Sequence, residues 1–339
     1  LEVPVDLSRV MFITTANTTD TIPRPLLDRM EVIELPSYTD EEKLQIAKRY
    51  LLPKEMKRHG LEKAQLKVSD GAIREMVASY TRESGVRVLE RKLAAICRKA
   101  AMHLVSEDVK QIRITEKELK DYLGAPRYYP ERQALEERVG VVNGLAWTSV
   151  GGELLEVEVN VVPGTGKVEL TGNLGDVMKE SAHAALSFIR SQADRLGIQG
   201  DFYQSKDIHV HFPEGAVPKD GPSAGIAITT AMVSALTGAP VKRGLAMTGE
   251  VTLRGRVLAI GGLKEKTMAA LRSGVHTVII PRDNVKDLEE IDQTVRSGLH
   301  FVPVDTVDQV FEAALAAPRG EHAAPRHRAS PEAPAALPV

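Results

Sequence analysis

The first candidate for chemistry is the serine of the segment PKDGPSAG, residues 218–225. Ser223 stands in a turn rich in glycine and proline, directly before a run of small and apolar residues that predicts a buried helix. The first N–H groups of a helix have no partner within it, so they can bind the negative oxygen that forms when a nucleophile attacks a carbonyl. No G-x-S-x-G elbow is present, and serine is also a preferred helix cap. The turn therefore predicts either a nucleophile or an N-cap at Ser223.

A candidate base lies in the segment GGLKEK, where a helix is expected to begin after Gly261 and Gly262. Lys264 and Lys266 fall in its first turn. The positive end of the helix dipole disfavours an ammonium ion and burial disfavours it further, so both effects lower the pKa of a lysine there. A neutral amine can serve as the base that a serine nucleophile requires. The alternative is a solvated lysine, and spacing alone does not bring either amine to the serine.

Three segments, PKDGPSAGIA, MTGEVTLRG and IGGLKEK, occur in this order and closely resemble the proteolytic domain of the Lon family of ATP-dependent serine proteases. The resemblance implies a Ser-Lys dyad with Ser223 as nucleophile and Lys266, not Lys264, as general base. It also implies that Thr248 hydrogen-bonds the catalytic amine. Asp220 is a candidate gate, because a carboxylate three residues before the nucleophile can pair with the lysine and keep it protonated. Ordinary turn chemistry of an Asp-Gly pair is the alternative for Asp220.

Histidines and metal ligands offer a different kind of site, and the sequence gives little support for either. His209 and His211 alternate with apolar residues in DIHVHF, which predicts a strand with both histidines on one face. They could flank the site, but neither has the signature of a Ser-His-Asp triad. No H-E-x-x-H motif or paired cysteine occurs, and the single Cys97 lies within a helical pattern. We therefore expect no metal site.

The first 35 residues predict a buried strand, a polar loop, a short helix and a second strand, as in a nucleotide-binding fold. The stretch VMFITTANTTDTIPRPLLDRMEVIEL resembles the end of the large AAA+ subdomain of the Lon family. The resemblance implies that Asn17 is the sensor-1 residue and Arg29 an arginine finger, which would reach the γ-phosphate on a neighbouring subunit. A polar loop residue and a surface ion pair are the respective alternatives.

Residues 36–124 have a helical pattern that predicts a small α-helical subdomain. Apolar residues recur at three- and four-residue intervals in YTRESGVRVLERKLAAICRKAAMHLV, so this helix should bury one face. The two capping-box pairs are Thr39 with Glu42 and Thr115 with Glu118. GVRVLER resembles the sensor-2 segment of the family, which implies a nucleotide-sensing arginine at Arg87. The alternative is a charged residue on a solvated helix face.

A phosphate-binding loop is absent from the sequence. No G-x-x-x-x-G-K-[ST] motif occurs, and PGTGKVEL lacks both the first glycine and the hydroxyl residue. By resemblance the Walker motifs lie upstream of Leu1, so the chain is expected to be a C-terminal fragment that does not hydrolyse ATP by itself. ATP or ADP with Mg is expected in the full-length protein, whereas peptide-bond cleavage requires no cofactor.

Alternating hydrophobicity in residues 153–171 predicts an antiparallel hairpin with residues 164–167 as its loop. The hairpin from Leu154 to Leu170 is a candidate edge for substrate contact, because an unfolded chain can add to a sheet as a strand. Plain packing of the hairpin is the alternative.

At 339 residues the chain exceeds the usual size of one core, so several domains are expected. We predict a multidomain α/β protein: the end of an AAA+ large subdomain (1–35), a small α-helical AAA+ subdomain (36–124), a linker (125–138), an α+β proteolytic domain (139–317) and a disordered tail (318–339). The tail assignment follows from its high content of proline and alanine.

The formal net charge of −2 gives no strong basic field for nucleic acid. There is no signal peptide and no apolar run of membrane-spanning length, so no membrane partner and a cytoplasmic location are expected. The resemblance implies a homo-oligomeric, hexameric ring that degrades unfolded or damaged polypeptides in protein quality control. A non-proteolytic ring-assembly or DNA-binding domain of an ATPase is the alternative, although nothing here indicates a surface for DNA. Complete motifs around Ser223 and Lys266 favour the protease.

Overall fold

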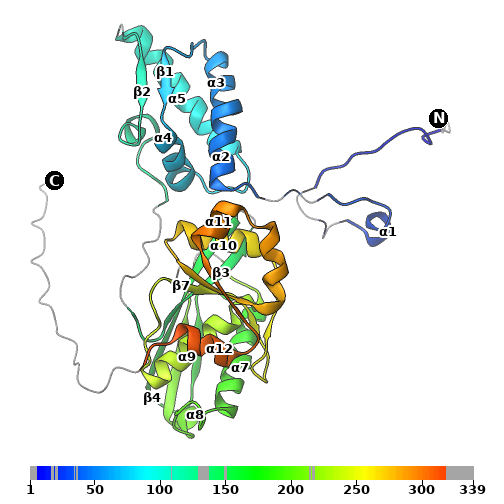
Figure 1. Cartoon of the computed structure of the whole chain (residues 1–339), viewed down its shortest axis with the longest axis vertical. Coiled ribbons are helices and arrows are strands. Elements are labelled where there is room, and N and C mark those ends of the chain that lie inside the picture. Colours follow the sequence, from blue (N-terminus) through cyan, green and yellow to red (C-terminus); the bar gives the residue numbers. More distant parts are fainter. Residues whose placement is uncertain are drawn as a thin grey trace, which may run out of the picture. The chain divides into compact units, whose positions relative to one another are not determined.

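A computed structural model of the chain describes residues 6–16, 19, 22–33, 35, 37–107, 109–128, 137–148, 151–213, 215 and 218–317 (Figure 1). The chain divides into two units, Leu1–Pro36 and Ser37–Val339. Asn17, most of the expected linker and the expected tail lie outside the described residues.

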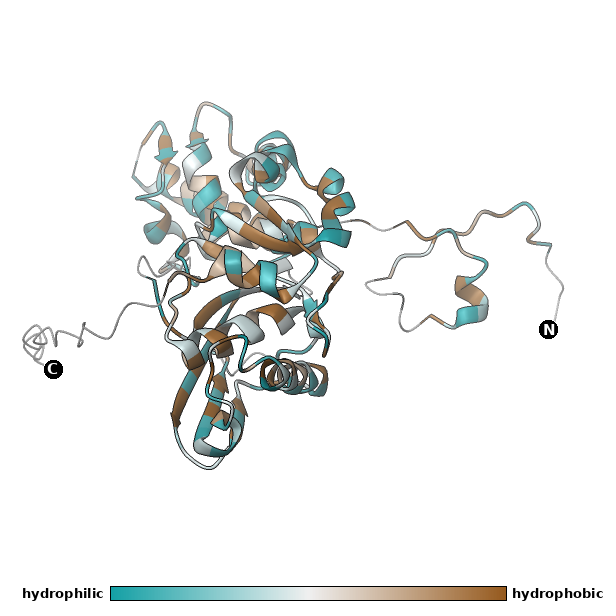
Figure 2. Ribbon diagram, turned by 60° about the horizontal axis from the view of Figure 1, so that its bottom comes forward, coloured by the Kyte–Doolittle hydropathy of each residue, from teal (hydrophilic) through white to brown (hydrophobic). Residues whose placement is uncertain are grey.

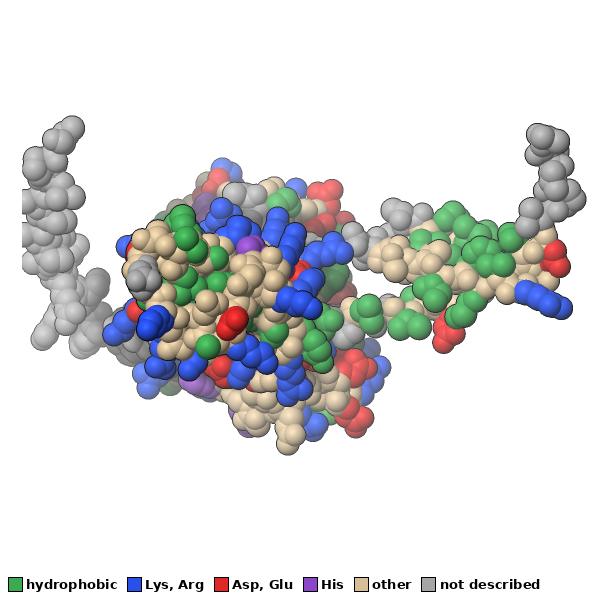
Figure 3. Space-filling view, turned by 90° about the horizontal axis from the view of Figure 1, so that it is seen from above, with side chains coloured by type: hydrophobic (Ala, Val, Ile, Leu, Met, Phe, Trp, Pro, Cys, Tyr) green, Lys and Arg blue, Asp and Glu red, His purple; other side chains and the backbone are tan. Residues whose placement is uncertain are grey.

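The N-terminal unit contains one short helix, α1 (Arg24–Leu27), in its described part. Apolar side chains at Met11, Phe12 and Ile13 are exposed, and Figure 3 shows many hydrophobic side chains on the surface of this unit. The two expected strands are not formed in the described residues. A strand needs a hydrogen-bonded neighbour, and the described part of this unit offers none.

Residues 37–124, the helical region, are built from helices around a core of their own. The helices are α2 (Asp40–Ile46), α3 (Leu52–Arg58), α4 (Asp70–Glu75), α5 (Arg87–Ser106) and α6 (Leu119–Leu123), with π-helical turns at Ala47–Leu51 and Met76–Tyr80. Strands β1 (Leu66–Val68) and β2 (Ile112–Ile114) pair in parallel. α5 buries Leu89, Leu93, Ile96 and Cys97 at three- and four-residue spacing, as its sequence predicts.

The first predicted capping box is confirmed. Thr39 N donates to Glu42 Oε2 at 2.7 Å, and Glu42 N donates to Thr39 Oγ1 at 3.1 Å. The second pair differs, because Thr115 donates to Glu118 Oε2 from both its backbone nitrogen and its hydroxyl. The hydroxyl therefore does not accept from the backbone, and α6 begins only at Leu119.

Residues 137–317, the sheet region, surround a mixed seven-stranded sheet in the order β11-β10-β7-β3-β4-β6-β5. Its strands are β3 (Val141–Thr148), β4 (Gly151–Pro163), β5 (Val168–Thr171), β6 (Lys206–His211), β7 (Leu245–Met247), β10 (Thr277–Pro281) and β11 (His300–Val304). β4 pairs antiparallel with β3 and β6, and the other pairings are parallel. A small separate ladder joins β8 (Glu250–Val251) and β9 (Val257–Leu258). The mixed sheet with its helices confirms the expected α/β character.

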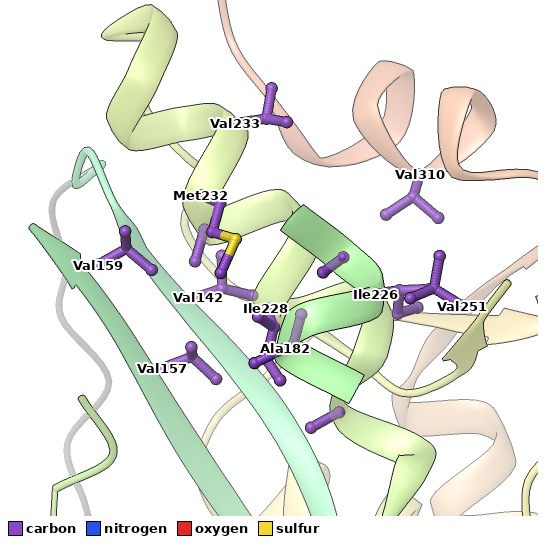
Figure 4. Packing of buried hydrophobic residues seen from close by; sticks show 14 of the residues in the cluster. Val142, Val157, Val159, Ala182, Ile226, Ile228, Met232, Val233, Val251 and Val310 are labelled. Carbon is purple, nitrogen blue, oxygen red and sulfur yellow. The ribbon is translucent and has the colours of Figure 1, made fainter. Parts of the chain in front are cut away.

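Helices cover both faces of the β3–β4 pair. The helices of this region are α7 (Asp176–Ser191), α8 (Phe202–Ser205), α9 (Gly225–Thr237), α10 (Leu263–Arg272), α11 (Gln293–Gly298) and α12 (Val307–Ala314), with 3₁₀ segments at Pro222–Ala224 and Arg282–Glu290. α9 is buried along most of its length, and Ile226, Ile228 and Met232 pack among side chains of the sheet, α7 and α12 (Figure 4). Figure 2 shows long hydrophobic stretches in these strands and mixed colours on the outer helices.

Alternation along β3 separates two cores. Val142 belongs to the cluster that contains α9, whereas Leu145 belongs to the cluster of Leu263 and Met268 on α10. Odd and even residues of a strand point to opposite faces of a sheet, so α9 and α10 pack on opposite sides of β3 and β4. The two helices begin at the candidate serine and the candidate lysine.

The predicted hairpin of residues 153–171 is wrong in its pairing. β6 lies between β4 and β5, and β5 pairs with β6 in parallel. The loop at Gly164–Lys167 is present, but Asp207 holds it by accepting from Thr165 N and Lys167 N at 2.8 Å each. Alternating hydrophobicity determines which face of a strand is buried, but it does not determine which strand pairs with it. β4 is an interior strand, so a substrate strand cannot add to it. Of the predicted hairpin, only β5 lies at an edge of the sheet and remains a candidate for substrate contact.

Within the described ranges, no helix is both long and apolar enough to cross a membrane. In the same part of the chain, no group of three or more His, Cys, Asp or Glu side chains is arranged to hold a metal ion.

Candidate active site

Ser223 lies in the 3₁₀ turn Pro222–Ala224 that leads directly into α9, and its side chain is half-buried. Gly221 opens the turn at φ +125°, a conformation that other residues rarely adopt. No side chain caps α9, and its N-cap residue is Ala224. Ser223 is therefore not the N-cap of α9, which was the alternative to a nucleophile at this position.

The backbone of Ser223 is tied to the turn that follows β7. Gly249 N donates to Ser223 O at 2.8 Å, and Ile226 N donates to Gly249 O at 3.1 Å. These two bonds fix the start of α9 against the end of a central strand. This role of Gly249 could not be predicted, because backbone pairing between distant turns leaves no pattern in residue types.

Lys266 reaches the same place from the opposite face of the sheet. It lies in the first turn of α10 and is 2 % exposed, whereas Lys264 is half-buried. Lys266 Nζ donates to Thr248 Oγ1 at 3.2 Å, and Thr248 Oγ1 donates to the Ser223 carbonyl oxygen at 3.3 Å. Within the described residues, no hydrogen bond joins the serine hydroxyl to the lysine amine directly. A buried threonine hydroxyl thus links the two candidate residues.

Burial lowers the pKa of Lys266 from its ordinary 10.5 to about 8. The main cause is loss of water around the ammonium form, and the neighbouring Glu265 carboxylate partly opposes it by raising the pKa. The direction agrees with the prediction from the sequence. An amine with this pKa is partly neutral near physiological pH, as a general base must be.

The Asp220 carboxylate contacts the first turn of α7. Its Oδ1 accepts from Met178 N at 3.0 Å and from Gly221 N at 2.9 Å. In the described part of the chain, no ion pair joins this carboxylate to Lys266. The gate predicted for Asp220 is therefore not formed in this arrangement, and the carboxylate satisfies N–H groups at a helix start and in the turn.

His209 and His211 lie on one face of β6, opposite the buried Ile208 and Val210, as predicted. Both rings hydrogen-bond Thr171 Oγ1 on the neighbouring β5, at 2.8 and 2.7 Å. Neither ring bonds Ser223 within the described residues. The two histidines of β6 therefore form a polar cluster with Thr171 of the edge strand β5. The sequence did not indicate Thr171 as a member of it.

The structure describes two of the three candidate nucleotide-contacting residues, Arg29 and Arg87. Arg29 is exposed just after α1, and Arg87 is the exposed first residue of α5. They belong to different units of the chain, and Asn17 lies outside the described residues.

Comparison with known proteins identifies the family of the chain. Residues 113–317 match the family described as the Lon protease (S16) C-terminal proteolytic domain, and residues 57–114 match the Lon protease AAA+ ATPase lid domain. The chain is 56% identical over 315 residues to Lon protease 1 of Bacillus subtilis, covering 93% of this chain and 41% of that protein. It is 55% identical over 316 residues to the Lon protease of Vibrio parahaemolyticus, covering 93% and 40%. The chain thus spans about two fifths of the length of these curated relatives. It belongs to the Lon protease family.

Proposed function

We propose that the chain is the protease-bearing part of an ATP-dependent serine endopeptidase of the Lon type, which degrades unfolded or damaged proteins. The observation that carries the proposal is the buried Lys266 amine, linked through Thr248 to the residue that bears the candidate nucleophile. A lysine held 2 % exposed with a pKa of about 8 has the protonation behaviour of a base rather than of a surface cation.

In the proposed reaction, the Ser223 oxygen attacks the carbonyl carbon of a peptide bond while Lys266 accepts the hydroxyl proton. The amine then returns this proton to the leaving nitrogen, the carbon–nitrogen bond breaks, and an acyl-enzyme remains. Water activated by the same amine releases the acyl group. Backbone N–H groups at the start of α9 would hold the oxyanion. Before the first step, the amine must move from Thr248 to the serine hydroxyl.

We propose nucleotide binding for the full-length protein because the chain belongs to the Lon protease family. Arg29, Arg87 and Asn17 would contact ATP or ADP with Mg, and the exposed guanidinium groups at 29 and 87 suit phosphate oxygens. ATP hydrolysis would supply the energy for moving a substrate. The proposal includes a hexameric ring in the cytoplasm whose chamber encloses the site, so that folded proteins are not cleaved.

The alternative, a non-proteolytic domain for ring assembly or DNA binding, is not favoured. Such a role requires neither a buried lysine nor a link from it through Thr248 to Ser223, and burying an amine has a cost in folding stability. Retention of both residues in this geometry favours proteolysis.

The proposal is tested by peptide hydrolysis with the chain, with Ser223→Ala and with Ser187→Ala. Ser187 is an exposed serine on α7 that bonds only within its own helix, so its variant should retain activity. Ser223→Ala should lose hydrolysis. Equal activity in all three proteins would remove Ser223 from the mechanism and with it the proposed function.

A further inference from the structure

A glycine on β4 contacts the helix that carries the buried lysine. Gly152 is the second residue of β4, and β4 packs along α10. A Cβ atom at this position would lie 1.9 Å from the carbonyl oxygen of Glu265 and 2.8 Å from the backbone nitrogen of Lys266. Neither distance is tolerable between non-bonded atoms. The backbones of strand and helix therefore touch here because residue 152 has no side chain.

The requirement for glycine at this position comes from space and not from backbone conformation. Gly152 is not among the glycines with positive φ, so its conformation is open to other residues. The atoms in the way belong to helix backbone and not to the flexible end of a side chain. Any larger residue must therefore displace the first turn of α10, which includes Lys266.

The far end of α10 is held by the same strand residue. Arg272, the last residue of α10, donates from Nη2 to Gly152 O at 3.0 Å. Its Nη1 lies 3.7 Å from Asp40 Oδ1, which is too long for a hydrogen bond. One residue of β4 thus meets the helix at its first turn by backbone contact and at its last turn through a guanidinium.

We propose that Gly152 and Arg272 are positioning residues, which together set the placement of α10 that brings the Lys266 amine to Thr248. The amine has one hydrogen-bond partner among the described residues and is buried against the sheet. A small displacement of the helix would break that bond and admit water to the amine. The inference rests on the proposed function, because it concerns the base of that reaction.

The test measures kcat, KM and the pH dependence of kcat/KM for peptide hydrolysis. Gly152→Ala should lower kcat on the order of 10²-fold with little change in KM, since a misplacement of about 1 Å costs this much. Water that reaches the displaced amine should raise its pKa from about 8 towards 10.5, so the rise of kcat/KM should move to higher pH. A merely destabilising change does not move this rise.

Variants of Arg272 test the same placement without adding bulk beside the lysine. Arg272→Gln should lower kcat about tenfold and shift the pH dependence in the same direction. Arg272→Lys keeps a cationic donor for the Gly152 carbonyl and should recover most of the activity. These variants decide the question if Gly152→Ala does not fold.

Three controls separate this effect from others. Arg195→Gln removes an exposed ion pair with Asp308. Gly200→Ala adds a methyl group that would meet Asp194 Oδ1 at an ordinary contact distance of 3.7 Å. Both variants should behave as wild type. Asp40→Asn should also leave kcat unchanged.

The inference would be overturned if both Gly152→Ala and Arg272→Gln had the kcat and pH dependence of the wild type. It would also be overturned if Asp40→Asn lost as much activity as Arg272→Gln. If Ser223→Ala is inactive in that same experiment, the proposed function stands and only the positioning role fails. If Ser223→Ala is fully active, the proposed function itself fails.

Discussion

Thr248 Oγ1 accepts a hydrogen bond from Lys266 Nζ at 3.2 Å, and both residues are buried. The same hydroxyl donates to the Ser223 carbonyl oxygen at 3.3 Å. Since Thr248 directly follows β7, a central strand sets the positions of both candidate catalytic residues. The threonine hydroxyl therefore bonds the Lys266 amine and the backbone of Ser223 at the same time.

Replacing Thr248 by valine keeps the shape of the side chain and removes this hydroxyl. We expect kcat/KM for peptide hydrolysis to fall about tenfold, since one hydrogen bond to a catalytic group is lost. Thr248→Ser keeps the hydroxyl and should retain most of the activity. Steady-state kinetics of the two variants side by side checks this, and an unimpaired Thr248→Val would show that the threonine does not orient the base.

The rate of hydrolysis should rise with pH through the pKa of the Lys266 amine, because only the neutral form accepts a proton. With burial lowering that pKa to about 8, kcat/KM should increase about tenfold per pH unit below this value and level off above it. A profile measured from pH 6 to pH 10 checks the position of the rise. A midpoint close to 10.5, the ordinary value, would contradict a buried base.

Lys266→Met should abolish hydrolysis and at the same time stabilise the fold at pH 7. The folded-state pKa of about 8 lies below the ordinary 10.5, so the unfolded chain binds the proton more tightly. This disfavours folding by about 3 kcal/mol below pH 8, at about 1.4 kcal/mol per pKa unit. The penalty shrinks as the pH rises from about 8 to 10.5, so the gain in the variant should shrink with it.

Urea unfolding followed by the fluorescence of Trp147, the single tryptophan and a residue of β3, measures this difference. Wild type and variant are compared at pH 7 and at pH 10, and the difference between them removes the titration of all other groups. A Lys266→Met protein less stable than wild type at pH 7 would argue against a buried amine.

Asp220→Ala should retain peptide hydrolysis and lower the stability of the sheet region. The carboxylate accepts from Met178 N at the start of α7, and loss of a helix cap of this kind costs about 1 kcal/mol. Asp220→Asn keeps an acceptor and should be nearer to wild type in urea unfolding. Complete loss of hydrolysis in the alanine variant would mean that Asp220 is needed for catalysis or for the turn itself, and not as a gate.

The resemblance of three segments to the Lon family, and not the spacing of residues, singled out Ser223 and Lys266 and preferred Lys266 to Lys264. The structure buries Lys266 fully and Lys264 only by half. Capping at Thr39 and the faces of His209 and Ile208 on β6 were also predictable, because they depend on local periodicity and short-range hydrogen bonds.

Other features could not be predicted because they depend on contacts between distant segments. The insertion of β6 between β4 and β5 depends on pairing across about 40 residues, for which alternation carries no signal. The bond from Gly249 to Ser223 and the contact of Gly152 with the backbone of Lys266 have the same origin. In the described residues, the expected strands near Met11 and Ile33 are not formed, because a strand requires a hydrogen-bonded neighbour.

The proposed roles of Ser223 and Lys266 are tested by identifying the residue that becomes acylated. The chain is mixed with an activated peptide ester at about pH 8.5, quenched in acid within the first turnover and digested for mass spectrometry, with Ser223→Ala and Lys266→Met treated in parallel. A Ser-Lys dyad should leave an acyl group on Ser223 in the wild type, none at that position in Ser223→Ala and a greatly slowed reaction in Lys266→Met. An acyl group on a different residue, or undiminished acylation of Lys266→Met, would contradict it.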